Sequence, residues 1–294
     1  MATTAEGEIQ KLKALEDRIK APCVWGRAPC GLRFEDLQDR RYDDAVKLLK
    51  KEFLNEEVTY RSVNITDPAN LEALEEFVHN ARVWMRDKVS LAAVKEKDDT
   101  LAGVLLMRIQ EKASFSRTFS RVKMTYDPIY TSVMTFYNEV ERPVDLFDKL
   151  QVRRYSKVYV LALKNRYRHR GIGKLMLKAA IELTKSAGVP AAAGIFTTGR
   201  GQAIADQLGF QKFNEVYYSR YLVDDKIVFA DTGVGNYSAA LMAYRIPEVE
   251  EAEELMRGMS SRYTVQGEEN AEEEGGDGES IKDDGGGDGS KVIQ

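Results

Sequence analysis

Cysteine and histidine are scarce in this 294-residue sequence, which contains two of each. Cys23 and Cys30 are too few for a disulfide framework and lack the spacing of a zinc motif. His79 and His169 are too few for a metal site built from histidines, and they argue strongly against a Ser-His-Asp hydrolase. We therefore predict that the protein uses no metal.

Long apolar runs are also absent. The sequence has no apolar leader segment and no stretch of 18 apolar residues, so it lacks the pattern of a secretory signal or a transmembrane helix. It contains no internal repeat. We expect a soluble, cytoplasmic monomer with no membrane partner.

Acidic residues are unevenly distributed. Residues 266–294 hold ten acidic side chains and two lysines, so the 43 basic and 47 acidic residues of the whole chain leave 41 and 37 for residues 1–265. The main part of the chain is therefore mildly basic. This charge suits an anionic small ligand, but it is too weak to indicate a nucleic-acid partner.

Three segments differ in composition. Residues 1–30 are predicted to form an N-terminal helical extension, because apolar residues recur at helical spacing before two prolines interrupt the pattern. Residues 31–247 have the composition of one α/β domain. Residues 248–294 are predicted to form an acidic helix and then a disordered tail rich in Glu, Asp and Gly.

Hydrophobic periodicity and turn signals predict the elements of the central segment. In chain order they are a strand at 33–37, helices at 42–53 and 71–85, a hairpin formed by 89–94 and 101–107, a polar loop at 111–128, a helix at 129–150 interrupted at Pro143, a strand at 158–163, a helix ending near residue 187, a strand at 191–196, a short helix at 202–208, and strands at 210–222 and 239–246. In the helix at 71–85 we expect Leu71, Leu74, Val78 and Met85 on the buried face.

A short basic turn rich in glycine, Arg168-His169-Arg170-Gly171-Ile172-Gly173, stands between a predicted strand and a predicted helix. Glycines let the backbone fold tightly and present consecutive N–H groups, and the start of the following helix carries a partial positive charge. Two arginines add guanidinium groups that match phosphate oxygens. The turn therefore predicts a site for a cofactor that contains a diphosphate.

This turn, together with Leu208-Gly209-Phe210 downstream, resembles the GNAT superfamily of acyl-CoA-dependent N-acetyltransferases over about residues 31–246. The resemblance implies a central, mixed, mostly antiparallel twisted sheet of about seven strands flanked by helices. It also implies acetyl-CoA as the co-substrate, held by the turn and by the backbone of a strand that splays from its neighbour. The implied cofactor-binding residues are Leu161, Ala162, Leu163, Arg168, His169, Arg170, Gly171, Ile172, Gly173 and Lys174.

A second stretch, Phe53-Leu54-Asn55-Glu56-Glu57-Val58-Thr59-Tyr60-Arg61, is similar to the end of the first helix in the insect arylalkylamine N-acetyltransferases. In that branch the glutamate at the position of Glu57 is the general base. The branch also has two hydroxyl residues four positions apart, which here correspond to Thr197 and Gly201, so only the first hydroxyl is kept. The resemblance implies that Glu57 and Thr197 are catalytic residues acting on a small arylalkylamine by direct attack in a ternary complex.

Several details of the acceptor site stay open. We expect Glu56, a like-charged neighbour, to help raise the pKa of Glu57, and either Tyr217 or Tyr218 is a candidate general acid. Two other functions compete with acetylation of a small amine: acetylation of a protein or peptide, and binding of acyl-CoA without efficient catalysis.

Overall fold

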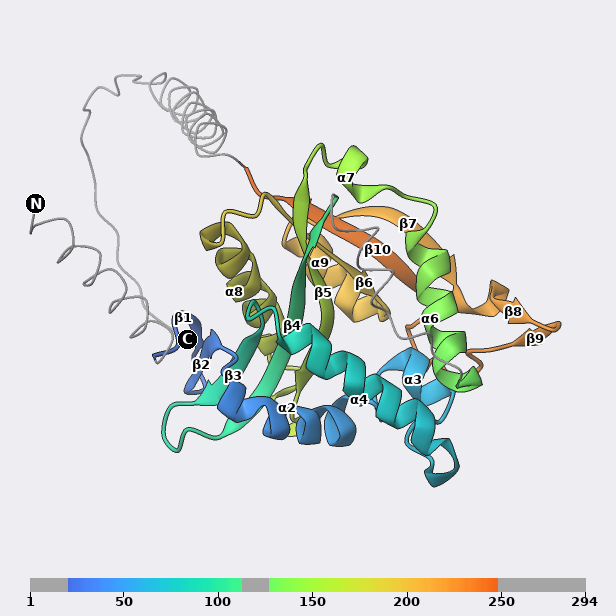
Figure 1. The fold of residues 1–294 in the computed structure, drawn as a ribbon, viewed down its shortest axis with the longest axis horizontal. Helices are drawn as coiled ribbons and strands as arrows, with labels where there is room; N and C mark the ends of the chain where they lie inside the picture. The colour runs from blue at the N-terminus through green and yellow to red at the C-terminus, as the bar shows by residue number, and fades with distance from the viewer. Residues whose placement is uncertain (1–20, 113–126, 248–294) are drawn as a thin grey trace, which may run out of the picture. The chain divides into compact units, whose positions relative to one another are not determined.

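The computed structural model describes residues 21–112 and 127–247. The helix predicted before residue 20, most of the polar loop at 111–128 and the acidic segment at 248–294 lie outside the described residues. Figure 1 shows the described chain as one twisted sheet with helices on both of its faces.

Eight strands form this sheet, in the order β1-β2-β3-β4-β5-β6-β10-β7, one more than the sequence indicates. The eight strands are β1 Val24–Ala28, β2 Leu32–Asp36, β3 Leu91–Lys95, β4 Leu101–Glu111, β5 Arg154–Leu163, β6 Ala191–Phe196, β7 Gln211–Tyr217 and β10 Ser238–Arg245. Every neighbouring pair is antiparallel except β5 and β6, which are parallel. A separate two-stranded ribbon contains β8 Leu222–Val223 and β9 Lys226–Ile227.

The extra strand is β1, in a segment that the sequence assigns to the N-terminal extension. It pairs with β2, and a Cβ on Gly26 would meet Ala179 at 3.6 Å, so the strand packs closely against the helix that carries Ala179. The indole Nε1 of Trp25 donates to Asp36. A five-residue edge strand with a glycine at its centre has little hydrophobic periodicity, which is why the sequence does not reveal it.

The helices follow the predicted order closely. They are α2 Tyr42–Leu48, α3 Val58–Ser62, α4 Leu71–Met85, α6 Pro128–Glu141, α7 Leu146–Lys149, α8 Ile172–Ser186 and α9 Gly199–Gln207, and short 3₁₀ or π turns join several of them: η1 Asp39–Arg41, η2 Leu49–Phe53, η3 Pro68–Asn70, η4 Asn165–Tyr167 and η5 Tyr218–Arg220. The bounds of α4 match the prediction, and Leu74, Val78 and Met85 of its predicted buried face pack in or against the core. The prediction is wrong at Leu71. Leu71 is 56% exposed, whereas Phe77, Ala81 and Trp84 are buried.

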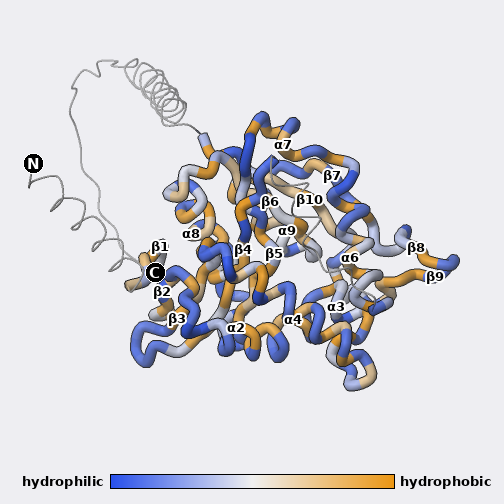
Figure 2. Tube along the Cα trace, in the orientation of Figure 1, coloured by the Kyte–Doolittle hydropathy of each residue, from blue (hydrophilic) through white to orange (hydrophobic). Residues whose placement is uncertain are grey.

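Two hydrophobic cores lie on the two faces of the sheet. Alternate residues of β3 divide between them: Ala92 and Val94 join the core with α2, α4 and α6, while Leu91 and Ala93 join the core with α8. This alternation follows from the two-residue period of a strand. In Figure 2 the hydropathy also alternates along the helices and strands, as expected for elements buried on one side. The sheet is thus packed on both faces, with one hydrophobic core on each.

Candidate active site

The parallel strands β5 and β6 diverge halfway along their length, as the resemblance implies. Their pairing ends at Val158 and Gly194, although β5 continues to Leu163. Tyr159 is an extra residue in the ladder with β4, because Leu106 pairs with Val160 and Met107 with Val158. A bulge of this kind bends its strand. Beyond it, one edge of β5 stays bonded to β4 and the other edge faces a pocket of about 940 Å³.

At one end of the pocket, the glycine turn forms the start of α8. His169 and Gly171 have left-handed backbones, with φ of 60° and 74°. Within the described residues, the backbone N–H groups of His169, Arg170 and Gly171 donate to no carbonyl or side chain of the chain, and the first N–H groups of a helix also lack partners inside it. A Cβ on Gly171 would meet nothing within 4 Å, and one on Gly173 would meet only Leu161. The turn is therefore an open cradle of free donors.

The two arginines of the turn lie differently from the sequence-based expectation. Arg168 donates to the backbone carbonyl of Leu163 at 2.9 Å and to that of Glu52 at 2.6 Å, and it forms ion pairs with the carboxylates of Glu52 and Glu56, both at 3.3 Å. Its guanidinium is thus used to join the turn to the segment before α3. Arg170 is exposed and is not among the residues that line the pocket.

At the other end of the pocket, Glu57 is the N-cap residue of α3. Its Oε2 accepts from the backbone N–H groups of Thr59 and Tyr60, at 2.9 Å and 3.0 Å, and from the Thr59 hydroxyl at 2.6 Å. The side chain is buried, and its other oxygen, Oε1, has no hydrogen-bond partner among the described residues. Burial raises the pKa of Glu57 even though these hydrogen bonds lower it. Burial is the largest cause of this shift, and the carboxylate of Glu56, which the sequence suggests as a cause, forms an ion pair with Arg168.

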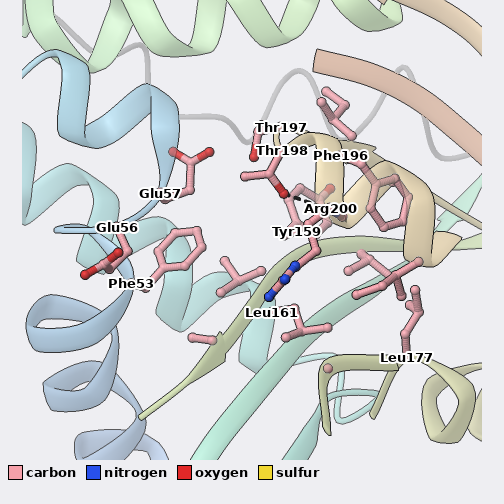
Figure 3. Close-up of a pocket in the computed structure, with 18 of the residues that line it drawn as sticks. Phe53, Glu56, Glu57, Tyr159, Leu161, Leu177, Phe196, Thr197, Thr198 and Arg200 are labelled. Carbon is pink, nitrogen blue, oxygen red and sulfur yellow. Dashed lines mark hydrogen bonds between the residues drawn. The ribbon is translucent and has the colours of Figure 1, made fainter. Parts of the chain in front are cut away.

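Thr197 lies near Glu57, as Figure 3 shows, and its hydroxyl also acts to lower the pKa of that carboxyl. Thr197 follows β6 directly and lines the pocket. The structure therefore brings together the two residues that the resemblance names as catalytic, although they are 140 positions apart in the chain.

The two tyrosines considered as general acids do not line the pocket. Tyr218 is buried, and its phenol donates to the backbone carbonyl of Thr197 at 2.7 Å. Tyr217 is 44% exposed, and its ring lies against the guanidinium of Arg220. Both tyrosines are therefore positioned for structural contacts.

A second hydroxyl reaches Glu57 from a residue that the sequence does not single out. Thr59 is fully buried and its hydroxyl hydrogen is donated to Glu57, so the Tyr137 phenol, 2.8 Å away, must donate to the Thr59 oxygen. Burial, and next the Glu57 charge, raise the pKa of Tyr137 well above its usual range, which keeps the phenol protonated. Tyr137, Thr59 and Glu57 thus form a directed chain of hydrogen bonds.

Aromatic side chains surround the space in front of Glu57. Five of them line this end of the pocket: Phe53, Tyr60, Trp84, Tyr137 and Tyr159. The rings of Trp84 and Tyr159 stack with their centroids 4.7 Å apart. Glu141 and Lys157 also line the pocket, and they form an ion pair, so their charges cancel. The space suits an aromatic ligand that carries a positive charge next to Glu57.

No part of the described chain contains a group of three or more His, Cys, Asp or Glu side chains arranged to hold a metal ion. Among its helices, none is long and apolar enough to cross a membrane.

Comparison with solved structures identifies the fold. Arylalkylamine N-acetyltransferase 2 from Aedes aegypti is 22% identical, with 74% of this chain and 99% of that chain covered and a TM-score of 0.66. The fold is that of the GNAT N-acetyltransferases. The putative arylalkylamine N-acetyltransferase 7 of the same mosquito is 23% identical over 77% of this chain and 96% of that chain, with a TM-score of 0.67.

A Drosophila melanogaster polyamine N-acetyltransferase has the same GNAT fold at 12% identity, over 73% of this chain and 100% of that chain, with a TM-score of 0.61. No protein-family model matches the sequence, and no curated protein matches it. These likenesses show the fold.

Proposed function

We propose that the protein transfers the acetyl group of acetyl-CoA to a small primary amine, and that the preferred acceptor is an arylalkylamine. The observation that carries this proposal is the position of Glu57. Glu57 lines the same pocket as the cradle of free N–H groups, and its Oε1 has no hydrogen-bond partner among the described residues. One space can therefore hold both a diphosphate and an ammonium group.

The residues present fit coenzyme A. Free donors at His169 to Gly171 suit the diphosphate, and the unpaired edge of β5 offers backbone hydrogen bonds to the amides of a pantetheine arm. The open space beside Gly171 and Gly173 lets phosphate oxygens approach the backbone. When bound, acetyl-CoA supplies the acetyl group as a thioester. Backbone N–H groups at the divergence of β5 are suitably placed to polarise its carbonyl.

Glu57 prepares the acceptor amine. An alkylammonium has a pKa of about 10.4 in water, so it must lose a proton before it can attack a carbonyl carbon. The raised pKa of Glu57 makes its carboxylate a better proton acceptor than an exposed glutamate. Because three donors occupy Oε2, the proton goes to Oε1.

Attack by the amine is direct in this proposal. Neither Cys23 nor Cys30 lines the pocket, so within the described chain no thiol is available to carry the acetyl group. The amine and the thioester therefore occupy the pocket together, in a ternary complex.

The aromatic walls support an arylalkylamine as the acceptor. Rings such as those of Trp84 and Tyr159 can stack on an aromatic acceptor, a contact that an aliphatic polyamine cannot make. The names of the two mosquito proteins point to the same class of substrate. The pocket is a single space of about 940 Å³, a size that ordinarily holds small molecules.

The test combines a substrate panel with one substitution. Turnover with acetyl-CoA is measured for tyramine, dopamine, serotonin, agmatine, spermidine and a set of peptides, and arylalkylamines should give the highest kcat/KM. Glu57→Gln should lower kcat about a hundredfold or more, because general-base catalysis contributes about that much. Its affinity for acetyl-CoA, measured by calorimetry, should change less than about twofold.

Glu72→Gln, an exposed carboxyl at the start of α4, is the matched control and should behave as wild type. Unchanged turnover in Glu57→Gln would remove that residue from the role of base. Tight binding of acetyl-CoA with no acetylated amine would favour a non-catalytic binder, and preferred turnover of peptides would favour a protein acetyltransferase. Absence of acetyl-CoA binding would overturn the entire proposal.

A further inference from the structure

The end of the pocket formed by the glycine turn is called the cofactor end, and the end that contains Glu57 is called the acceptor end. The positive charge at the cofactor end does not come from the arginines of the glycine turn. Arg168 faces two carboxylates and two backbone carbonyls, so its charge is compensated and its N–H groups are engaged. Arg170 lies outside the pocket lining. A diphosphate in the cradle would therefore meet free backbone donors, but no guanidinium from the turn itself.

Arg200 supplies a guanidinium from a different part of the chain. It is the second residue of α9 and lines the pocket, and its Nη1 contacts the ring Nδ1 of His169. In Figure 3 its side chain extends from the start of α9 toward β5 and Leu161. Among the described residues, Arg200 has no carboxylate partner. Its charge is therefore uncompensated, and it reaches the edge of the cradle.

Lys174 strengthens the field at the same end. It lines the pocket from α8 and donates to the side chain of Gln207 in α9 at 2.9 Å, again without a carboxylate partner among the described residues. The other charged side chains of the lining fall into two classes. Lys157 pairs with Glu141, and Arg168 pairs with both Glu52 and Glu56, all of which line the pocket. The remaining charged residue, Glu57, lies at the opposite end. The free cations are thus gathered next to the cradle.

We propose that Arg200 binds the diphosphate of the coenzyme and, on binding, exchanges the His169 ring for a phosphate oxygen. This inference rests on the proposed function, since it takes coenzyme A as the ligand. A guanidinium can donate two parallel hydrogen bonds to a phosphate, and such charge-assisted bonds are about twice as strong as neutral ones. The His169 contact holds the free side chain close to the position in which it is needed, which lowers the ordering cost of binding.

The experiment compares Arg200→Gln with Arg166→Gln. Arg166 is an exposed arginine of η4 that does not line the pocket, so its substitution removes the same charge outside the site. Dissociation constants are measured by calorimetry for coenzyme A, 3′-dephospho-coenzyme A and S-acetylpantetheine, which has no phosphate. Arg200→Gln should weaken binding of both nucleotides about tenfold or more and leave S-acetylpantetheine unchanged. Arg166→Gln should change each of the three values less than about twofold. Arg200 is exposed, so the unfolding temperature should stay at the wild-type value.

Each other outcome is informative. A loss confined to coenzyme A and absent for the 3′-dephospho form would assign Arg200 to the 3′-phosphate and overturn the diphosphate contact. An equal loss for S-acetylpantetheine, an equal loss in Arg166→Gln, or no loss in Arg200→Gln would also overturn it. If the wild-type protein binds no coenzyme A, the proposed function fails, and that failure is visible before any variant is made.

Discussion

The two ends of the pocket are built in opposite ways. The cofactor end is made largely from consecutive residues, 163 to 174, and its donors are backbone N–H groups. The acceptor end is assembled from η2, α3, α4, α6 and β5, and its functional atoms belong to side chains such as those of Glu57 and Tyr137. A backbone site needs space and a fixed turn, whereas a side-chain site needs several distant segments to fold correctly. At the cofactor end, the effect of a substitution should therefore depend on the volume of the new side chain. At the acceptor end, it should depend on the functional group that is lost.

The largest effect expected at the cofactor end comes from Gly173→Val. A Cβ at this position would meet only Leu161, at 3.7 Å, so alanine fits, but the branched side chain of valine would fill the space over the free N–H groups. We expect acetyl-CoA affinity to fall about a hundredfold, the loss of two or more charge-assisted hydrogen bonds. Calorimetry measures this loss.

Gly173→Ala is the control, and it should bind acetyl-CoA within about threefold of wild type while gaining stability from its helical position. Equal binding by the valine and alanine variants would show that volume over the turn is unimportant. The contrast between the two ends of the pocket would then be lost.

A smaller effect is expected at the acceptor end from Thr59→Val, which removes a hydroxyl and keeps the shape of the side chain. The Thr59 hydrogen bond lowers the pKa of Glu57, so its loss should raise that pKa further. Because the base works only when ionised, the acidic limb of the kcat profile should move to higher pH in the variant. We expect about a tenfold loss of kcat near neutral pH and unchanged acetyl-CoA affinity.

Stability gives an independent readout of the same carboxyl. The pKa of Glu57 is raised in the folded state above its ordinary value of 4.5, so the folded protein binds the extra proton between these two values. This contribution to stability is fully present below pH 4.5 and is lost as the pH rises through the folded pKa. The Glu57→Gln variant has no titrating carboxyl here, so it does not lose this stability as the pH rises. The difference in unfolding free energy, variant minus wild type, should therefore increase with pH. A constant difference would mean that burial does not control this group.

The same contrast explains how much of the fold and the site could be predicted. The glycine turn and the bounds of α4 were predictable because their signals lie within a few neighbouring residues. The prediction for the buried face of α4 is wrong at Leu71, which begins the helix and is exposed, and it omits the buried Phe77 and Trp84. Thr59 lies within two residues of the N-cap Glu57, where a capping contact could have been suspected.

The contacts that Tyr137 and Arg200 make have no such local signal. Tyr137 meets Thr59 from 78 positions away, and Arg200 meets His169 from 31 positions away. Such contacts depend on how distant helices and strands pack together in the folded protein, which the pattern of a single sequence does not specify. The compensation of Arg168 by Glu52 and Glu56 is hidden for the same reason, since it joins segments more than a hundred positions apart.

The smallest effects are expected from Tyr217 of β7 and Tyr218 of η5, which lie next to the acceptor end but do not line the pocket. Tyr218→Phe leaves the Thr197 carbonyl without its donor, so the unfolding free energy should fall by about 1 kcal/mol. The kcat should change less than about threefold, because the phenol lies outside the pocket lining. Tyr217→Phe, at a 44% exposed position, should change neither quantity. A hundredfold loss of kcat in Tyr218→Phe with normal folding would make its phenol a proton donor and would extend the acceptor end beyond Thr197.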